Sequence, residues 1–299
     1  MNKSNILLYH GVTKEKNSVG IENCSGKHMD ADVFEQQMKY ISENKNVITL
    51  RELVRLIEAD EPCPPDCVAV TFDDSFKNIR TVALPILKKY NVPATFFITT
   101  AMVGNNRLFW VDRLEHTINR TERKLLCLEG KYYTLRTSTD KIDTLTKVKR
   151  MLKSARPSKR NTVLKAIEDQ LGVFPYHDVV NYENLTWDDV SELDDFPQYE
   201  VGGHTVNHEI LSYLSTEQMT YEICHCLKIL SERVGRDVNL FSYPEGQREH
   251  YNDEVISILK ENGVRICPSA VEGENYDNDD SFHLKRNMVG FVGREFPFE

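Results

Sequence analysis

Short apolar segments alternate with amphipathic segments along most of this 299-residue chain, and this alternation limits the possible folds. Seven segments have the length and composition of strands: 5–9, 68–72, 94–99, 199–202, 238–243, 264–268 and one near 283–289. Between them, apolar residues recur at helical spacing in segments 32–44, 50–58, 75–90, 216–234 and 252–262. This pattern predicts an α/β fold with a parallel sheet. The number of strands favours a distorted (β/α) barrel, closed or nearly closed, over an open doubly wound sheet.

Residues 104–186 interrupt this alternation with mostly helical, charged sequence, which predicts an insertion within a single domain spanning 1–299. The insertion carries a block of nine basic residues: Lys141, Lys147, Lys149, Arg150, Lys153, Arg156, Lys159, Arg160 and Lys165. We favour a solvated helical face as the interpretation of this block. A site for a phosphate-bearing substrate is the alternative.

The composition excludes several classes of protein. A hydrophobic content of 40% and a charged content of 28% are those of a soluble globular protein, and no apolar run has the length of a membrane span. The apolar run 6–9 is too short for a signal-peptide core, so we expect a cytoplasmic location. Seven scattered cysteines match no disulfide framework or structural zinc module. The net charge of −9 argues against nucleic acid and favours a small or glycan-like partner.

Two short motifs follow apolar strand segments and supply groups for metal-assisted hydrolysis. Thr-Phe-Asp-Asp at 71–74 ends the segment 68–72, and His-Thr-Val-Asn-His at 204–208 follows the segment 199–202. Adjacent buried carboxylates raise each other's pKa unless a cation or a proton neutralises part of their charge. Two imidazoles and one carboxylate bind a divalent metal and leave a coordination position open for water, which hydrolysis requires.

Each motif alone has an ordinary explanation. Asp74 or Ser75 could cap the helix expected over 75–90, and pairs of histidines at this spacing are common on protein surfaces. Both motifs, however, lie at the ends of strand segments, where α/β folds place their chemistry. The combination therefore favours a metal centre with one carboxylate left to act as a base. Zinc is the default for these ligand types, with cobalt, nickel or iron as alternatives.

These motifs, with several longer segments, resemble the polysaccharide deacetylase family, also called the NodB-homology family of carbohydrate esterases. Its first motif, TFDD, is present at 71–74, and its second, H-[ST]-x-x-H, is present at 204–208. Ser-Tyr-Pro-Glu-Gly at 242–246 stands where most members have R-P-P-Y-G, and is similar to the Y-P-x-G motif of branches that act on exopolysaccharides. Segments 109–114 and 185–190 resemble stretches common in members associated with glycan assembly.

The resemblance implies a role for each residue of the metal site. Asp74, His204 and His208 hold the metal, and Asp73 accepts a proton from the bound water. Leu-Leu-Tyr-His at 7–10 resembles an L-x-H motif that many relatives carry near the C-terminus, as expected if this branch is circularly permuted. His10 then protonates the departing amine.

The third motif and two tryptophans are expected to contact the substrate. The motif places Tyr243, Pro244 and Glu245 at the reacting carbonyl. Since Pro244 has no N–H, a backbone N–H near Glu245, together with the metal, stabilises the oxyanion. Trp110 and Trp187 could form walls that stack on sugar rings, although most tryptophans serve packing.

One charge in the expected site lacks its usual partner. Most relatives orient and balance the catalytic aspartate with the arginine of the third motif, where this chain has Ser242. We expect Arg286, from another strand, to replace that arginine beside Asp73. His283 is a rival of His10 for the acid role, but it lies an odd number of positions from Arg286. On a regular strand their side chains face opposite ways.

The resemblance implies a metal-dependent hydrolase that removes an N-acetyl group from an amino sugar in a glycan or glycan precursor. We expect a nucleotide-, lipid- or oligosaccharide-linked sugar, because no export signal is evident. One alternative is hydrolysis of a non-sugar amide or cyclic imide. Another is non-catalytic carbohydrate binding, prompted by the altered third motif. An iron oxygenase with two histidines and one carboxylate would leave Asp73 without a purpose.

Overall fold

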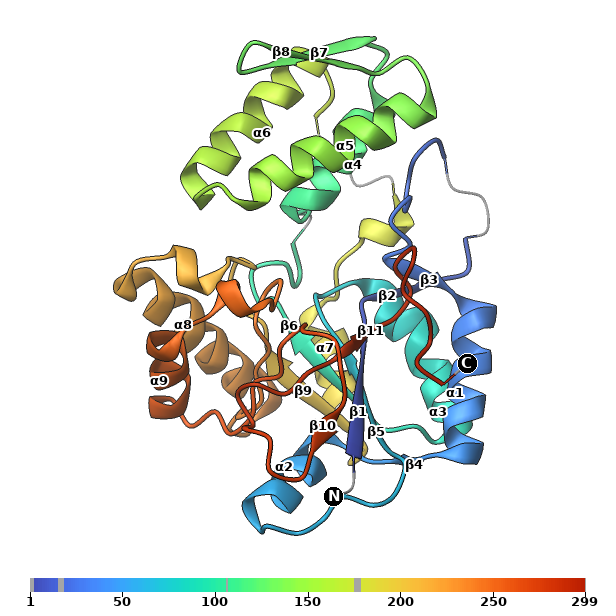
Figure 1. Ribbon diagram of the computed structural model, residues 1–299, viewed down its shortest axis with the longest axis vertical. Helices are drawn as coiled ribbons and strands as arrows, with labels where there is room; N and C mark the ends of the chain where they lie inside the picture. The colour runs from blue at the N-terminus through green and yellow to red at the C-terminus, as the bar shows by residue number, and fades with distance from the viewer. Residues whose placement is uncertain (1–2, 16–18, 106, 175–178, 299) are drawn as a thin grey trace.

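The computed structural model describes residues 3–15, 19–105, 107–174 and 179–298 (Figure 1). Its main sheet has seven strands with the central order β10–β1–β5–β6–β9, and β11 pairs with β1 while β4 pairs with β5. These pairings are parallel except that of β10 with β1. The strands are β1 (Lys3–Tyr9), β4 (Asn46–Val47), β5 (Cys67–Phe72), β6 (Ala94–Ile98), β9 (Tyr199–Gly203), β10 (Asn275–Tyr276) and β11 (Asn287–Met288).

Isolated bridges and backbone hydrogen bonds continue this sheet into a ring. After β9 the ring runs through the segments around 240, 266 and 284, and β11 returns it to β1. The backbone links after β9 are Gly203–Phe241, Leu240–Ile266, Cys267–Ser281 and Ser269–Leu284. The chain therefore forms the distorted (β/α) barrel that the alternation of segments predicts.

Four expected elements differ from the structure. The strand expected near 283–289 is limited to β11, Asn287–Met288. Segments 238–243 and 264–268 form isolated bridges instead of strands. The first is followed by Pro244 and the second ends at Pro268, and a proline cannot donate a hydrogen bond to a strand ladder. The helix expected over 75–90 begins at Lys77, because Phe76 forms a bridge with Asn184. It continues as η1 from Ile79 and α3 from Leu84.

Helices flank the ring, with α1 and α3 on one side and α8 and α9 on the other in Figure 1. α1 begins where the Asp30 carboxylate accepts hydrogen bonds from two backbone N–H groups, and α8 begins at a reciprocal cap between Ser215 and Gln218. None of the helices in the described part of the chain is long and apolar enough to cross a membrane. The helical elements of the barrel are α1 (Ala31–Asn44), α2 (Leu50–Glu58), η1 (Ile79–Ala83), α3 (Leu84–Tyr90), α7 (Trp187–Asp194), η3 (Leu211–Tyr213), α8 (Thr216–Val234), η4 (Arg248–His250) and α9 (Asp253–Glu261).

Most of the segment 104–186 forms a lobe at the top of Figure 1, beyond the carboxyl ends of the barrel strands, which we call the cap. It contains α4 (Trp110–Arg120), α5 (Ser138–Lys153), α6 (Pro157–Leu171) and an antiparallel hairpin of β7 (Leu125–Leu128) and β8 (Lys131–Thr134). The sequence predicts the helices but not this hairpin. The remaining short elements are β2 (Gly11–Thr13), which pairs with β3 (His28–Asp30), and η2 (Val180–Tyr182).

The cap has a hydrophobic core separate from that of the barrel. Its buried members come from all three cap helices and the hairpin, together with one residue of an N-terminal loop. They are Ile21, Trp110, Leu114, Ile118, Leu126, Leu128, Leu135, Leu145, Val148, Leu152, Leu164, Ile167 and Leu171. A lobe with its own core can lose stability without loss of the barrel.

Replacing Leu164 of α6 with alanine tests this separation. Leu164 is fully buried in the cap core, so we expect the cap to lose about 2–5 kcal/mol of stability. Amide hydrogen exchange should accelerate in α5 and α6 while β5 and β6 keep their protection. The exposed neighbour Lys165, replaced by alanine, is the control and should change neither region. Equal loss of protection in cap and barrel would show that they unfold as one unit.

Candidate metal centre

The end of β5 places the two acidic residues of the first motif at the mouth of the barrel. Asp73 and Asp74 follow β5 directly, and both are buried. The Asp73 N–H still donates to the Tyr9 carbonyl of β1, at 3.0 Å. Asp74 has a left-handed φ of 70°, which turns the backbone out of the strand. Such strained conformations cluster at functional sites, and here they recur at Thr205, His208 and Glu245.

Asp74, His204 and His208 form a cluster that fits a metal ion. One oxygen or nitrogen atom of each lies within 4.8 Å of those of the others. From Asp74 Oδ1, the distance to His208 Nε2 is 3.2 Å and to His204 Nε2 is 3.9 Å. Burial raises the pKa of Asp74 to about 7, and no described residue donates a hydrogen bond to its buried Oδ1. A cation would stabilise this oxygen, so the residues present fit a divalent metal.

Both imidazoles are prepared to bind a metal in their neutral form. Burial lowers the pKa of His204 and of His208, which keeps each ring uncharged near neutral pH. His204 Nδ1 lies 2.9 Å from the carbonyl oxygen and 2.7 Å from the hydroxyl of Ser242. An Nδ1–H that donates to this carbonyl leaves the Nε2 lone pair for the metal. Ser242 therefore orients His204, a role that no sequence motif indicates.

Arg286 makes the contact with Asp73 that the sequence predicts. Its Nη1 and Nη2 donate to the two carboxylate oxygens, each at 2.7 Å, and its Nε donates to the Ser269 carbonyl at 2.7 Å. Burial pushes the pKa of Asp73 upward, but the charge of the fully buried Arg286 outweighs this effect and brings the pKa to about 2. Asp73 is therefore ionised. His283 lies elsewhere, with its Nδ1 2.8 Å from Arg248 Nη1.

His10 follows β1 and lines the same 220 Å³ cavity as Asp73 and the metal cluster. Its ring meets that of Phe291 edge-on with centroids 5.1 Å apart, and no described residue bonds to its buried Nδ1. Burial lowers the pKa of His10 to about 3, so its imidazole is neutral in the resting protein. A donor role for His10 therefore requires that a proton reach the ring during the reaction.

The third motif meets the metal cavity through Tyr243 and Glu245. The Tyr243 hydroxyl is used elsewhere, because it donates to the Phe282 carbonyl at 3.1 Å, and its ring stacks on Tyr251 with centroids 4.0 Å apart. Tyr243 thus supplies an apolar wall. Glu245 also lines the cavity, whereas Pro244 between them does not.

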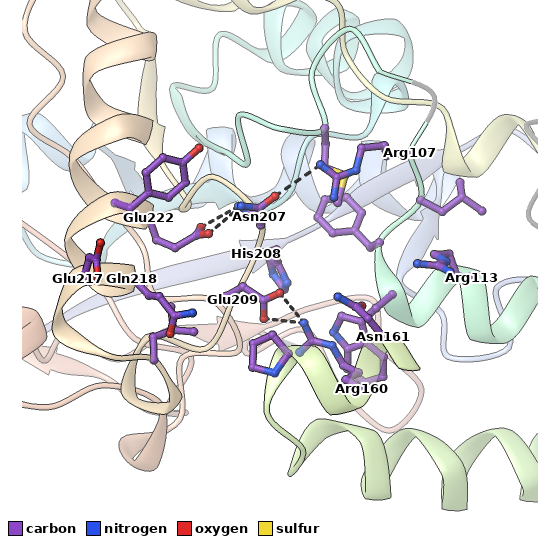
Figure 2. A pocket seen from close by; sticks show the side chains of 17 residues that line it. Arg107, Arg113, Arg160, Asn161, Asn207, His208, Glu209, Glu217, Gln218 and Glu222 are labelled. Carbon is purple, nitrogen blue, oxygen red and sulfur yellow. Dashed lines mark hydrogen bonds and ion pairs between the residues drawn. The ribbon is translucent and has the colours of Figure 1, made fainter. Parts of the chain in front are cut away.

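Three ion pairs join loops at the site to three different helices of the cap. Written with the cap residue first, they are Lys153–Glu245 (2.5 Å), Arg160–Glu209 (2.5 Å) and Asp112–Lys27. Figure 2 shows the Arg160 guanidinium directed at Glu209, which follows the metal-cluster residue His208. Burial pushes the pKa of Glu245 upward, but Lys153 outweighs this effect and brings it to about 2. Lys27 and Lys153 were not expected at the site. Lys153 belongs to the basic block of the insertion, whereas no sequence pattern indicated Lys27.

A second pocket of 580 Å³ adjoins the metal cavity, and His208 lines both (Figure 2). It lies between α4 and α6 of the cap and α8 of the barrel. Trp110 lines this second pocket rather than the metal cavity. Trp187 lines neither, because it lies on α7 with the Arg233 guanidinium 4.8 Å over its ring. The structure therefore does not support Trp187 as a substrate wall.

Comparison with known proteins decides the family. Residues 60–267 match the family model described as polysaccharide deacetylase, which is more than half of the chain. The chain belongs to the polysaccharide deacetylase family. The matched region contains all three motifs, whereas His10 and Arg286 lie outside it. The protein is accordingly a hydrolase of the carbohydrate deacetylase class, as the motifs imply.

One relative aligns with nearly the whole chain and another with about a third of it. A Bacillus subtilis protein, YxkH, whose name places it among polysaccharide deacetylases, is 25% identical over 294 residues, covering 97% of this chain and 74% of that protein. The poly-beta-1,6-N-acetyl-D-glucosamine N-deacetylase of Staphylococcus aureus is 32% identical over 112 residues. That alignment covers 37% of this chain and 36% of the enzyme.

Solved structures share the barrel. The Streptococcus pyogenes deacetylase PplD aligns with a TM-score of 0.63 at 20% identity, covering 96% of this chain and 92% of that one. IcaB from Ammonifex degensii aligns with a TM-score of 0.62 at 17% identity, covering 97% and 92%. At these identities the likeness establishes the fold alone.

Replacing Arg286 with glutamine should destabilise the protein by about 3–5 kcal/mol at pH 7, because it leaves the buried Asp73 carboxylate unpaired. The folded pKa of Asp73, about 2, lies below its unfolded value of about 3.9. Ionisation of Asp73 therefore stabilises the wild type above about pH 4, and this contribution disappears as pH falls toward 2. The difference between wild type and variant should shrink over that range. Urea denaturation at pH 7 and at pH 3 measures it.

Arg265→Gln is the matched control, because Arg265 pairs with Glu58 on the exposed surface. Loss of such a pair costs at most about 1 kcal/mol. Equal losses in the two variants, or a loss in Arg286→Gln that does not diminish on acidification, would contradict the role of the buried pair.

Proposed function

We propose that the protein is a metal-dependent N-deacetylase that hydrolyses the acetamide of an amino sugar within a glycan. The observation that carries the proposal is a cluster of two histidines and one carboxylate that shares a cavity with a second, buried carboxylate, Asp73, kept ionised by Arg286. The Staphylococcus aureus relative is named for action on poly-beta-1,6-N-acetyl-D-glucosamine, which supports an N-acetylated sugar as substrate.

The cluster of Asp74, His204 and His208 would hold the metal. A divalent ion held there would supply Lewis-acid chemistry, lowering the pKa of a water and polarising the acetamide carbonyl. Asp73 accepts the proton of the attacking water, while Arg286 keeps Asp73 ionised and oriented. A backbone N–H near the left-handed turn of the third motif stabilises the oxygen that gains negative charge.

We assign the last proton transfer to His10. Asp73 has a pKa of about 2, so it readily releases a proton gained from water. That proton passes to the neutral His10 ring, because negative charge that develops in the cavity raises the proton affinity of the ring. His10 then protonates the nitrogen, since an amine anion cannot leave near neutral pH. The products are acetate and a free amino sugar.

We propose zinc as the metal, because two imidazoles and one carboxylate with an open position form a common catalytic zinc site. Cobalt, nickel and iron are the alternatives. The expected cytoplasmic location stays a prediction, as does the link of the sugar to a nucleotide, lipid or oligosaccharide.

We further propose that the glycan continues from the metal cavity into the 580 Å³ pocket beside His208. Trp110 and Tyr221 supply aromatic surface there, and Asn161 and Asn207 supply amide groups. The pocket has no excess charge, because three arginines are balanced by three glutamates: Arg107, Arg113 and Arg160 against Glu209, Glu217 and Glu222. Aromatic walls with balanced polar groups suit a neutral pyranose ring.

Asp73→Asn should retain zinc binding but lower kcat by about 10²–10⁴-fold, because only the base is lost. His204→Ala should lose both zinc binding and activity, since it removes a metal ligand. Acetate release from N-acetylglucosamine oligosaccharides, with and without a chelator, and calorimetric zinc titration provide the measurements. Asp195→Asn, an exposed carboxylate at the end of α7, is the control and should behave as wild type.

Two outcomes would overturn the proposal. The first is activity that survives both chelation and Asp73→Asn. The second is turnover of cyclic imides with no acetate release from any N-acetylated sugar, which would make a non-sugar amide the substrate.

Tyr221→Ala should raise KM for an N-acetylglucosamine tetrasaccharide by about 10-fold, a loss typical of one aromatic contact. KM for the monosaccharide should stay unchanged, because a single ring occupies only the metal cavity. Tyr132→Ala is the control, since Tyr132 is 71% exposed on the cap hairpin and Tyr221 is 52% exposed beside the pocket. Equal effects of Tyr221→Ala on KM for both substrates would show that the glycan does not extend into this pocket.

A further inference from the structure

The inner side of α5 forms one wall of a cleft that continues the metal cavity. The cleft has a volume of 400 Å³ and shares four lining residues with the metal cavity: Lys27, Val111, Lys149 and Lys153. A ligand whose reacting group lies at the metal centre can therefore extend into this cleft beneath the cap.

The lining of this cleft is basic, although the whole chain has a net charge of −9. Four basic residues, Lys27, Lys149, Arg150 and Lys153, face two acidic ones, Asp112 and Glu115. Asp112 already pairs with Lys27. Glu115 accepts hydrogen bonds from the Tyr182 hydroxyl and the Asn23 N–H, and burial raises its pKa. Both acidic groups have partners, so the cleft keeps positive charge for a ligand.

The residues of the basic block in the cap differ in whether they have an acidic partner. Several members away from the cleft have acidic partners, in the pairs Lys147–Asp143, Lys159–Glu129, Arg160–Glu209 and Lys165–Asp169. Lys149 and Arg150 line the cleft, and neither forms an ion pair with any residue that the structure describes. Two other members have no acidic partner among the described residues: Lys141 donates to the Asn119 and Thr121 carbonyls, and Arg156 lines a separate pocket of 330 Å³. Lys149 and Arg150 are therefore the members whose unpaired charge lies at the cleft.

We propose that this cleft binds a phosphate group of the substrate, next to the N-acetylated sugar whose amide reaches the metal centre. The inference rests on the proposed function and specifies its substrate as a phosphate-linked amino sugar. Among the described residues that line the cleft, Lys149 and Arg150 are the basic groups without an acidic partner. An ammonium and a guanidinium group form strong charge-assisted hydrogen bonds with phosphate oxygens. This assignment replaces the solvated-face interpretation for these two residues.

Steady-state acetate release tests the proposal with three substrates: N-acetylglucosamine 1-phosphate, uridine diphosphate N-acetylglucosamine and the neutral N-acetylglucosamine disaccharide. We expect KM of the wild type to be at least about 10-fold lower for a phosphorylated substrate, with an advantage that falls as salt rises. The double variant Lys149→Met/Arg150→Met should raise that KM by about 10- to 100-fold and change KM of the neutral substrate far less. The two phosphorylated probes distinguish a simple phosphate from a diphosphate carrier.

Lys147→Met is the matched control, because Lys147 lies on the same helix, is 57% exposed and pairs with Asp143. Equal KM values for charged and neutral substrates, or equal effects of the double variant on both, would overturn the phosphate site and leave the deacetylase proposal intact. Absence of acetate release from all substrates would overturn the proposed function instead. Calorimetric titration with pyrophosphate then tests the cleft alone, and unchanged binding in the double variant would reject it.

Discussion

The buried ion pair between Asp73 and Arg286 sets the conditions for both the barrel and its metal site. Two adjacent carboxylates occupy one cavity, and their repulsion would favour protonation of at least one of them. Arg286 neutralises Asp73 and leaves the charge of Asp74 for a cation. Because Arg286 directly precedes β11, which closes the ring against β1, closure of the barrel and ionisation of the base depend on the same contact.

Ion pairs also fix the position of the cap over the metal site. Each of its three helices holds a different loop through an ion pair, and two of those loops carry Glu245 and the metal-cluster residue His208. A partly buried ion pair repays its desolvation only when its geometry is good. The pairs therefore favour one orientation of the cap, which positions the basic cleft and the neutral pocket on either side of a shared metal cavity.

Local patterns made part of this architecture predictable. α2 and α8 have the bounds expected from apolar spacing, and the metal cluster follows from two motifs at strand ends, because both signals lie within short stretches of chain. Ser242 could not be assigned, since its contact with His204 joins segments 38 residues apart. The position of Lys149 beside the metal cavity likewise could not be predicted, because it depends on how the cap packs against the barrel. The β7–β8 hairpin did have a local signal in the sequence, namely Gly130. Its turn requires positive φ values at Glu129 and Gly130, and glycine adopts such values readily.

The separate core of the cap has an evolutionary consequence. Substitutions on the inner surfaces of α5 and α6 can alter the groups that meet the substrate without disturbing the packing of the barrel or the metal ligands. The cap residues that meet the substrate thus belong to a different layer of packing from the metal ligands. A lineage with this architecture can be redirected to new glycans by changes in one lobe, while selection preserves a single hydrolytic chemistry in the other.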